Sequence, residues 1–293
     1  MLGAMLGGHP RHVAVPEMQF KLDLLGVVGP DRRLDAGAAV EAIANQPRFR
    51  AWGVDPSVVG ELEGPTYRDA IEALARAFAQ RSGKTDVAVW VDHTPRNMNF
   101  ASTISEEFPD GRFVHIVRDG RAVAASLLRV DWGPNTIDEA ARMWLTRLCY
   151  GLAAEAATEG VIPVTRVRYE DLVAEPEPTL RQLCEQLELE YHPDMVEAGG
   201  FTPPASSRSI HELVGRPPAL DRTEAWRREL TPRQIEIFES IANDALRMVG
   251  YAPDLGRRAR PPTRRERYGF RLRELVSRPV LRARRRRRWR LDT

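Results

Sequence analysis

Residues 113–126 combine the side chains and the spacing that a phosphate-binding site needs. Their apolar start predicts a buried strand, and a helix is expected to follow the turn at Asp119 and Gly120. Arg118 at the strand end offers a guanidinium suited to bidentate phosphate binding, and Ser126, eight positions later, offers a hydroxyl. Backbone amides at the start of the helix would add donors for the same anion. Spacing alone leaves a structural alternative open, in which Arg118 pairs with Asp119 and Ser126 is an ordinary helix serine.

The elements around this stretch alternate between strand and helix patterns, which predicts an α/β fold with a parallel sheet flanked by helices. Strands are expected at residues 87–91, 112–117 and 161–169, and helices at 66–80, 96–108, 121–130, 136–158, 176–188 and 231–249. Thr66 and Thr136 each begin a capping box, and Thr231 with Pro232 begins the last of these helices. Ligands of such sheets bind at the carboxyl ends of the strands, where Arg118 stands.

Residues 82–85, Ser-Gly-Lys-Thr, have the sequence that ends a Walker A phosphate loop. However, Phe78 stands where that loop needs its first glycine, and the order here is helix then strand instead of strand then helix. We therefore expect Lys84 to lie in a solvated turn.

Charge divides the chain into two parts. The 16 Arg and three acidic residues from Arg257 onward give +13, whereas the preceding residues, with 27 basic and 38 acidic side chains, give −11. We therefore predict a globular domain at residues 1–254 and an Arg-rich tail at 255–293. Apolar residues from Tyr268 to Val276 predict a short amphipathic helix before Pro279. A solvated, disordered tail, a polyanion-binding tail and a tail held on an anionic membrane surface remain open, and the apolar residues favour the membrane over nucleic acid.

Several classes of protein are not supported by the composition. Cys149 and Cys184, the only cysteines, form neither a disulfide framework nor a zinc spacing, and the six His residues form no metal-binding motif. No apolar run approaches the ~20 residues that span a bilayer. Residues 1–8 lack the charged start of a signal peptide. The expected location is therefore the cytoplasm, with peripheral attachment to a membrane through the tail as the alternative.

Residues 113–126 resemble the 3′-phosphate-binding motif of the sulfotransferase superfamily, with its strand-end Arg and a Ser eight positions later. Other segments resemble that family in the expected order; they are His9-Pro10 with Pro16-Glu17, Asp92-His93-Thr94-Pro95, Tyr169-Glu170-Asp171-Leu172, and Trp226-Arg227 with Gly250-Tyr251. The first of them is similar to the corresponding region of bacterial and tyrosylprotein sulfotransferases. The likeness extends from residue 1 to about residue 251. Each motif is short, so the resemblance rests on their common order.

The resemblance implies the P-loop NTPase-like sulfotransferase fold and transfer of a sulfuryl group from 3′-phosphoadenosine 5′-phosphosulfate (PAPS) to an acceptor hydroxyl. It implies that Arg118 and Ser126 hold the 3′-phosphate, that Trp226 stacks on adenine and that Arg227 contacts a phosphate. A core tryptophan and a surface arginine are equal alternatives for the last two. The implied acceptor is a small molecule, a glycan or a lipid. No metal is required, and nucleic acid is not an expected partner.

Two catalytic roles follow from the same resemblance. Glu17 matches the glutamate that acts as the base in related enzymes and would take the proton of the acceptor hydroxyl; a helix-starting acid is the alternative. His93 stands where relatives often carry Lys, and its imidazolium would donate a hydrogen bond to the leaving oxygen while protonated. The alternative for His93 is a side chain that caps the strand end beside Asp92.

The likeness to the family begins partway along the family's sequence pattern, after its first strand and loop. The first strand of the family and its glycine-rich loop, which holds the 5′-phosphosulfate, would precede Met1. We therefore expect a sulfotransferase fold without its first strand and phosphate loop, through a start codon placed too late or an N-terminal deletion. A catalytically inactive relative that binds nucleotide or nothing is one alternative to an active enzyme. The other is a protein that acts through its Arg-rich tail.

Overall fold

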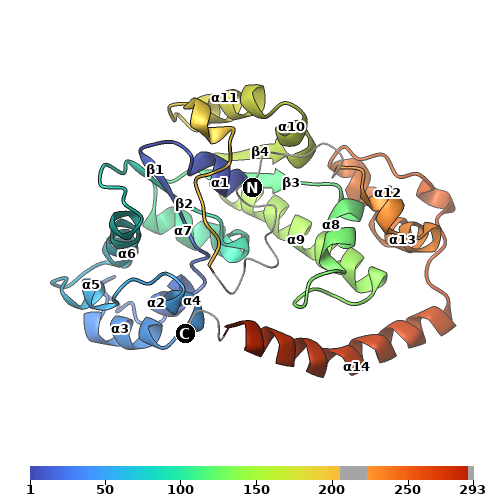
Figure 1. The fold of residues 1–293 in the computed structure, drawn as a ribbon, viewed down its shortest axis with the longest axis horizontal. Helices are drawn as coiled ribbons and strands as arrows, with labels where there is room; N and C mark the ends of the chain where they lie inside the picture. Colours follow the sequence, from blue (N-terminus) through green and yellow to red (C-terminus); the bar gives the residue numbers. More distant parts are fainter. Residues whose placement is uncertain (205–222, 290–293) are drawn as a thin grey trace.

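The computed structural model describes residues 1–204 and 223–289. The strands of these residues form two parallel pairs, which are β1 (His12–Val15) with β2 (Val89–Asp92), and β3 (Phe113–Val117) with β4 (Val164–Arg168) (Figure 1). Val15 pairs with Asp92, and Val117 pairs with Arg168, so the two strands of each pair end together. The predicted α/β fold with parallel strands is confirmed, and the described strands lie in two sheets where one was expected.

Helices surround the strands (Figure 1). In chain order they are α1 (Leu2–Leu6), α2 (Lys21–Leu25), α3 (Ala36–Ala44), α4 (Pro47–Arg50), α5 (Ser57–Gly60), α6 (Tyr67–Arg81), the 3₁₀ helix η1 (Pro95–Phe100), α7 (Ala101–Glu107), α8 (Gly120–Leu127), α9 (Ile137–Ala157), α10 (Tyr169–Ala174), α11 (Pro176–Gln186), η2 (Pro193–Met195), α12 (Trp226–Glu229), α13 (Pro232–Met248), η5 (Gly256–Arg258) and α14 (Arg264–Trp289).

Local sequence sets the starts of α6 and α13. Thr66 begins α6 with the predicted capping box, in which its side chain accepts a bond from an amide of the first turn. Thr231, predicted as the start of the last helix, caps α13 and also forms a capping box with Gln234. The box predicted at Thr136 is wrong. The Thr136 hydroxyl donates to Glu274 of α14 at 3.1 Å, and the same carboxylate accepts the amide of Asn135 at 2.7 Å. A distant carboxylate therefore replaces the local cap at the start of α9.

Close packing fixes α8 against its neighbours. One cluster of buried apolar residues lies among α8, α9, α12 and α13. At Gly120, an added Cβ would lie 2.6 Å from side-chain carbons of Trp144 in α9 and Phe238 in α13. Such a contact is too short for any side chain, so glycine at this position lets the helix start directly after β3.

The C-terminal helix α14 differs from the sequence expectation. It continues through Pro279, where a short helix was expected to have ended, and it packs on the body instead of being a solvated tail. Glu266 binds Arg233 at 2.8 Å, and Phe270 packs against the cluster that contains α9 and α13. The charge boundary at residue 255 thus does not coincide with a loss of tertiary contacts.

Lys84 is structural, and the expectation of a solvated turn was wrong. Its ammonium donates to the carbonyls of Gly7 at 2.9 Å and His9 at 3.1 Å, and to that of His12. These three carbonyls belong to the segment from α1 to β1, so Lys84 ties the end of α6 to that segment. Three carbonyl acceptors satisfy all three N–H donors of the ammonium group.

We expect His12 to make the stability of the fold depend on pH. Its side chain is buried at 3% exposure and stacks on His9 with ring centroids 4.0 Å apart. Burial, and then repulsion from His9, lowers the pKa of His12 to about 4. Between about pH 6.5 and that value the unfolded chain binds a proton that the folded chain does not. The contribution of the neutral His12 to the free energy of unfolding is therefore fully present above about pH 6.5. It is lost as the pH decreases towards about 4, and the loss is ~3 kcal/mol at most.

Chemical unfolding of the wild type and of His12→Gln at about pH 7.5 and about pH 5 measures this effect. The substituted glutamine cannot titrate but keeps a donor for the carbonyl of Leu6, which His12 Nδ1 contacts at 3.0 Å. The wild type should lose ~2 kcal/mol more than the variant between the two pH values. An equal loss in both proteins would assign the titration to another group.

Candidate functional site

Glu17 lies two residues beyond the carboxyl end of β1. Its carboxylate accepts hydrogen bonds from Arg48 Nη1 of α4 at 2.5 Å and from Gln19 Nε2 at 3.2 Å. About a third of the side chain, 34%, is exposed. Glu17 is therefore a carboxylate that solvent can reach and that its neighbours hold in one orientation, at the edge where parallel sheets bind ligands.

A buried polar network ties this segment to the end of β2. The Asp92 carboxylate accepts bonds from Lys21 Nζ, from the amide of Thr94 at 2.9 Å and from Asn97 Nδ2 at 3.0 Å. Burial alone would raise the pKa of Asp92, but Lys21 and these hydrogen bonds hold it below its ordinary value. The Thr94 hydroxyl in turn accepts the amide of Met18 at 2.7 Å. Since Met18 directly follows the candidate base, the network fixes the backbone at that position.

His93 packs between α1 and the segment that follows η2. A Cβ on Gly3 of α1 would lie 3.3 Å from His93, and the ring of Phe201 meets the imidazole edge-on with centroids 4.8 Å apart. The amide of Thr94, just after the end of β2, donates a hydrogen bond to the Asp92 carboxylate. Asp92 therefore caps this strand end, a role that the sequence left open for His93. The hydrogen bond from His93 to a leaving oxygen stays a prediction.

Arg118 stands at the carboxyl end of β3, immediately before α8. Its guanidinium carbon lies 4.1 Å from the centroid of the Tyr169 ring, at the first residue of α10. The Asp119 carboxylate, which the structural alternative assigned to Arg118, binds Arg121 at 2.8 Å. Ser126 is half-buried in α8. The structure thus places Arg118 and Ser126 at one strand end and on the helix that follows it.

Carboxylates already occupy donors in the first turn of α8. Asp119 Oδ1 accepts the amide of Arg121 at 2.8 Å, and Glu170 Oε1 accepts the amide of Asp119 at 3.1 Å. The expectation that these amides would be available to an anion is therefore wrong for part of the turn, because local carboxylates satisfy them. At this end, the side chains of Arg118 and Ser126 stay the predicted contacts for an anion.

Helix α9 joins the two strand ends. Trp144 Nε1 donates to the carbonyl of Arg118 at 3.3 Å. Arg147 follows one turn later on the same face of α9. Burial lowers the pKa of Arg147, and the nearby Glu17 carboxylate opposes that shift, so the two side chains lie within electrostatic reach. The Arg147 guanidinium also lies 5.8 Å from the ring of Trp132. Helix α9 therefore contacts the end of β3 through Trp144, and its Arg147 lies within electrostatic reach of Glu17 after β1.

Trp226 lies in the core and Arg227 at the surface, as in the structural alternatives that the sequence left open for them. Trp226 is buried, and the guanidinium carbons of Arg121 and Arg227 lie 4.1 and 4.3 Å from its ring centroid. Arg227 is partly exposed and pairs with Asp254 at 2.6 Å. This packing favours the core tryptophan and the surface arginine. Contacts of the two residues with adenine and phosphate stay predictions.

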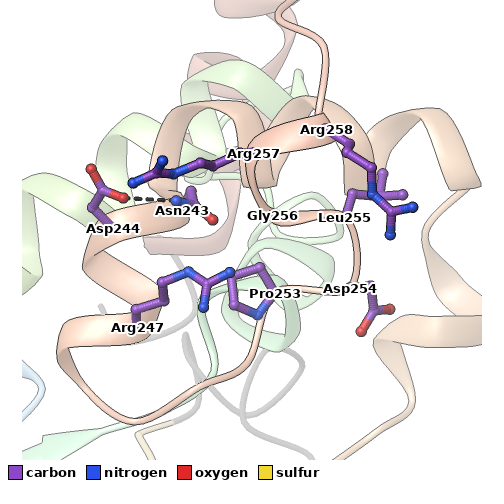
Figure 2. A pocket seen from close by; sticks show the side chains of 9 residues that line it. All are labelled: Asn243, Asp244, Arg247, Pro253, Asp254, Leu255, Gly256, Arg257 and Arg258. Carbon is purple, nitrogen blue, oxygen red and sulfur yellow. Dashed lines mark hydrogen bonds between the residues drawn. The ribbon is translucent and has the colours of Figure 1, made fainter.

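A polar hollow of about 630 Å³ lies apart from these strand ends. Figure 2 shows its lining, which consists of Asn243, Asp244, Arg247, Pro253, Asp254, Leu255, Gly256, Arg257 and Arg258. Asp254 connects it to the predicted site residues through its pair with Arg227.

In residues 1–204 and 223–289, no group of three or more His, Cys, Asp or Glu side chains could hold a metal ion. No helix in these ranges is long and apolar enough to cross a membrane.

Sequence reasoning missed the residues that hold the candidate site in place, chiefly Lys21, Arg48 and Arg147. A signal for Lys21 was available, because only two of the 43 basic residues are Lys. Both of them, Lys21 and Lys84, donate to several acceptors within the protein. The two arginines gave no comparable signal, since they are two among many and their partner Glu17 is distant in sequence.

The family of this chain is shown by a comparison with family models. Residues 1–193 match the model described as the sulfotransferase family. The nodulation protein NoeE of Sinorhizobium fredii is 24% identical over 283 residues, which cover 87% of this chain and 64% of NoeE. The chain thus spans slightly less than two thirds of the length of this curated relative.

The comparison with solved structures concerns the fold alone. The sulfotransferase domain from the curacin biosynthetic pathway superimposes with a TM-score of 0.54 at 16% identity, covering 85% of this chain and 92% of that domain. The sulfotransferase domain of the Synechococcus PCC 7002 olefin synthase gives a TM-score of 0.49 at 19% identity, covering 82% and 89%. The first of these two domains shares the fold of this chain.

Proposed function

This chain belongs to the sulfotransferase family, and from that premise we propose that it transfers a sulfuryl group from PAPS to a hydroxyl group of an acceptor. The observation that supports the proposal most is the bridge made by α9. Trp144 contacts the backbone of Arg118, and Arg147 lies within electrostatic reach of Glu17. The candidate phosphate contact and the candidate base therefore belong to one region of the molecule.

In the proposed reaction, Glu17 takes the proton of the acceptor hydroxyl. The acceptor oxygen forms a bond to sulfur, and the bond from sulfur to the phosphate oxygen of PAPS breaks, which releases 3′-phosphoadenosine 5′-phosphate. Negative charge spreads over the transferred group and the leaving oxygen, so positioning and electrostatics govern the rate. His93, when protonated, would donate a hydrogen bond to the leaving oxygen. In the structure its imidazole packs edge-on against the ring of Phe201.

Arg118 and Ser126 would hold the 3′-phosphate of PAPS. The chemistry of the two groups fits this role, because a guanidinium forks onto phosphate oxygens and a hydroxyl adds one more donor. The ring of Tyr169 supports the guanidinium of Arg118, and Trp144 fixes its backbone carbonyl. The side chain is thereby held near the strand end before a ligand arrives, which reduces the entropy lost on binding.

The acceptor would lie beside Glu17, and the side chains there favour one chemical class. Arg48 and Arg147 place two positive charges near one carboxylate, so the region has an excess of positive charge. Trp132, whose ring Arg147 approaches, is 37% exposed and offers a face for a sugar or aryl ring. These groups favour a ring-bearing acceptor with a negative charge near the hydroxyl that receives the sulfuryl group.

A thermal-shift titration with 3′-phosphoadenosine 5′-phosphate tests the donor half of this proposal. At ~100 times its dissociation constant the ligand should stabilise the wild type by about 2.7 kcal/mol, and Arg118→Ala should abolish most of this shift. Arg112→Ala is the matched control, because Arg112 pairs with Glu188 directly before the amino end of the same strand. Shifts of equal size in all three proteins, or no shift in the wild type, would contradict the assignment.

A further inference from the structure

Helix α14 has one face that is fixed to the body. Glu274 binds the amide of Asn135 and the hydroxyl of Thr136 at the start of α9, and Phe270 packs against the nearby apolar cluster. One turn before Phe270, Glu266 binds Arg233 of α13. The anchoring residues are four positions apart and therefore share one side of the helix. These contacts set which side of α14 faces away from the body.

The opposite face carries an apolar stripe that the residues at 1–204 and 223–289 leave largely exposed. We use the term outer stripe for Tyr268, Leu272, Leu275, Val276 and Val280, whose exposed fractions range from 52% to 72%. Their spacing of three or four residues places them along one side of a helix. Figure 1 shows α14 running along the outside of the molecule, so this side is accessible over several turns. Large apolar side chains at such exposure mark an interaction surface.

Arginines border the outer stripe on both sides. At ~100° per residue, Arg264 and Arg271 fall beside one edge of the stripe, and Arg273 falls beside the other. All three are exposed. The whole helix contains 12 Arg and two Glu in its sequence, whereas residues 1–256 carry a net charge of −11. Positive charge is therefore concentrated in α14 and in the arginines just before it, whereas the body carries a net negative charge.

We propose that α14 docks this protein on an anionic lipid bilayer, with the outer stripe at the boundary between headgroups and acyl chains. An apolar face bordered by arginines is complementary to the two layers of such a surface. Each Arg near an anionic membrane contributes about 1 kcal/mol, and the apolar residues add the hydrophobic part. Nucleic acid would use the arginines and leave the stripe exposed, so the stripe distinguishes between the two partners. Glu17 and Arg118 lie after β1 and β3, outside α14, so the docking helix and the candidate site are separate parts of the protein.

Cosedimentation of the full chain with vesicles tests the proposal. We expect binding to vesicles of phosphatidylcholine with about one third phosphatidylserine, and at least ~10-fold weaker binding to pure phosphatidylcholine. The double substitution Leu272→Asp/Leu275→Asp should reduce binding to the anionic vesicles by ~10-fold or more, because it removes apolar burial and adds negative charge. Val161→Asp/Met248→Asp is the matched control, since both side chains are exposed apolar residues outside α14.

A short labelled RNA serves as the competing partner in the same buffers. The proposal predicts that Leu272→Asp/Leu275→Asp weakens vesicle binding by a larger factor than RNA binding. Equal losses for both partners would indicate a general polyanion site and overturn the proposal. Vesicle binding that the double substitution leaves unchanged would overturn it as well. The circular dichroism of both double variants shows whether the fold is retained, and single Leu272→Ser provides a milder change that keeps the comparison decisive.

Discussion

Glu17→Gln is expected to lower the rate of sulfuryl transfer by ~10²–10⁴-fold, because the amide cannot take the proton of the acceptor hydroxyl. Gln keeps the size of the side chain and an oxygen that can accept the bond from Arg48, which lies 2.5 Å from the carboxylate. The loss should therefore appear in kcat, with a smaller change in KM. Turnover of an acceptor hydroxyl compound with PAPS, measured as release of 3′-phosphoadenosine 5′-phosphate, follows this change.

Glu107→Gln is the matched control for this experiment. Glu107 forms a similar 2.5 Å pair with Arg32 at the end of α7, and it has no place in the proposed site. The control should keep nearly full activity. If Glu17→Gln retained the wild-type rate, or if both variants lost activity to the same degree, Glu17 would not be the base. Binding of 3′-phosphoadenosine 5′-phosphate should survive in Glu17→Gln, which separates loss of the base from loss of the fold.

The second large effect concerns stability. Arg121→Met should lower the free energy of unfolding by about 3–5 kcal/mol, because it leaves carboxylates buried without their counter-charge. Arg121 is 3% exposed in its side chain and binds Asp119 at 2.8 Å and Glu239 at 2.7 Å, and the Glu239 side chain has no exposed area. The guanidinium also lies over the buried ring of Trp226. Urea unfolding at neutral pH measures the change through the midpoint and the slope.

Arg227→Met is the matched control for Arg121. Its guanidinium also lies over the Trp226 ring and also pairs with a carboxylate, that of Asp254, but 44% of the side chain is exposed. An exposed pair contributes only about 0–1 kcal/mol, so this variant should remain close to the wild type. A similar loss for both variants would show that contact with the ring, and not the buried charges, dominates the effect.

Interactions between residues near each other in the chain were predictable. The capping box at Thr66, the helix start at Thr231 and the strand before Arg118 involve groups within a few residues of one another. Backbone geometry and side-chain reach fix such contacts whatever the rest of the chain does. The same reason explains why the order of short family motifs pointed to the sulfotransferase family, which the match of residues 1–193 now shows. The short strand β1 was missed, because four residues carry too little periodicity to be recognised.

Contacts between distant residues were not predictable, even where local patterns looked complete. Thr136 has the sequence of a capping box, but its hydroxyl donates a hydrogen bond to Glu274, which is 138 positions away in the chain. Arg147 lies within electrostatic reach of Glu17, and Lys21 binds Asp92, only because separate helices and strands pack together. Amino-acid order thus set the elements and the motif at Arg118, since these depend on neighbouring residues. Packing chose the partners of each charged group, because burial removes water and leaves every buried charge dependent on whichever opposite charge the fold brings within reach.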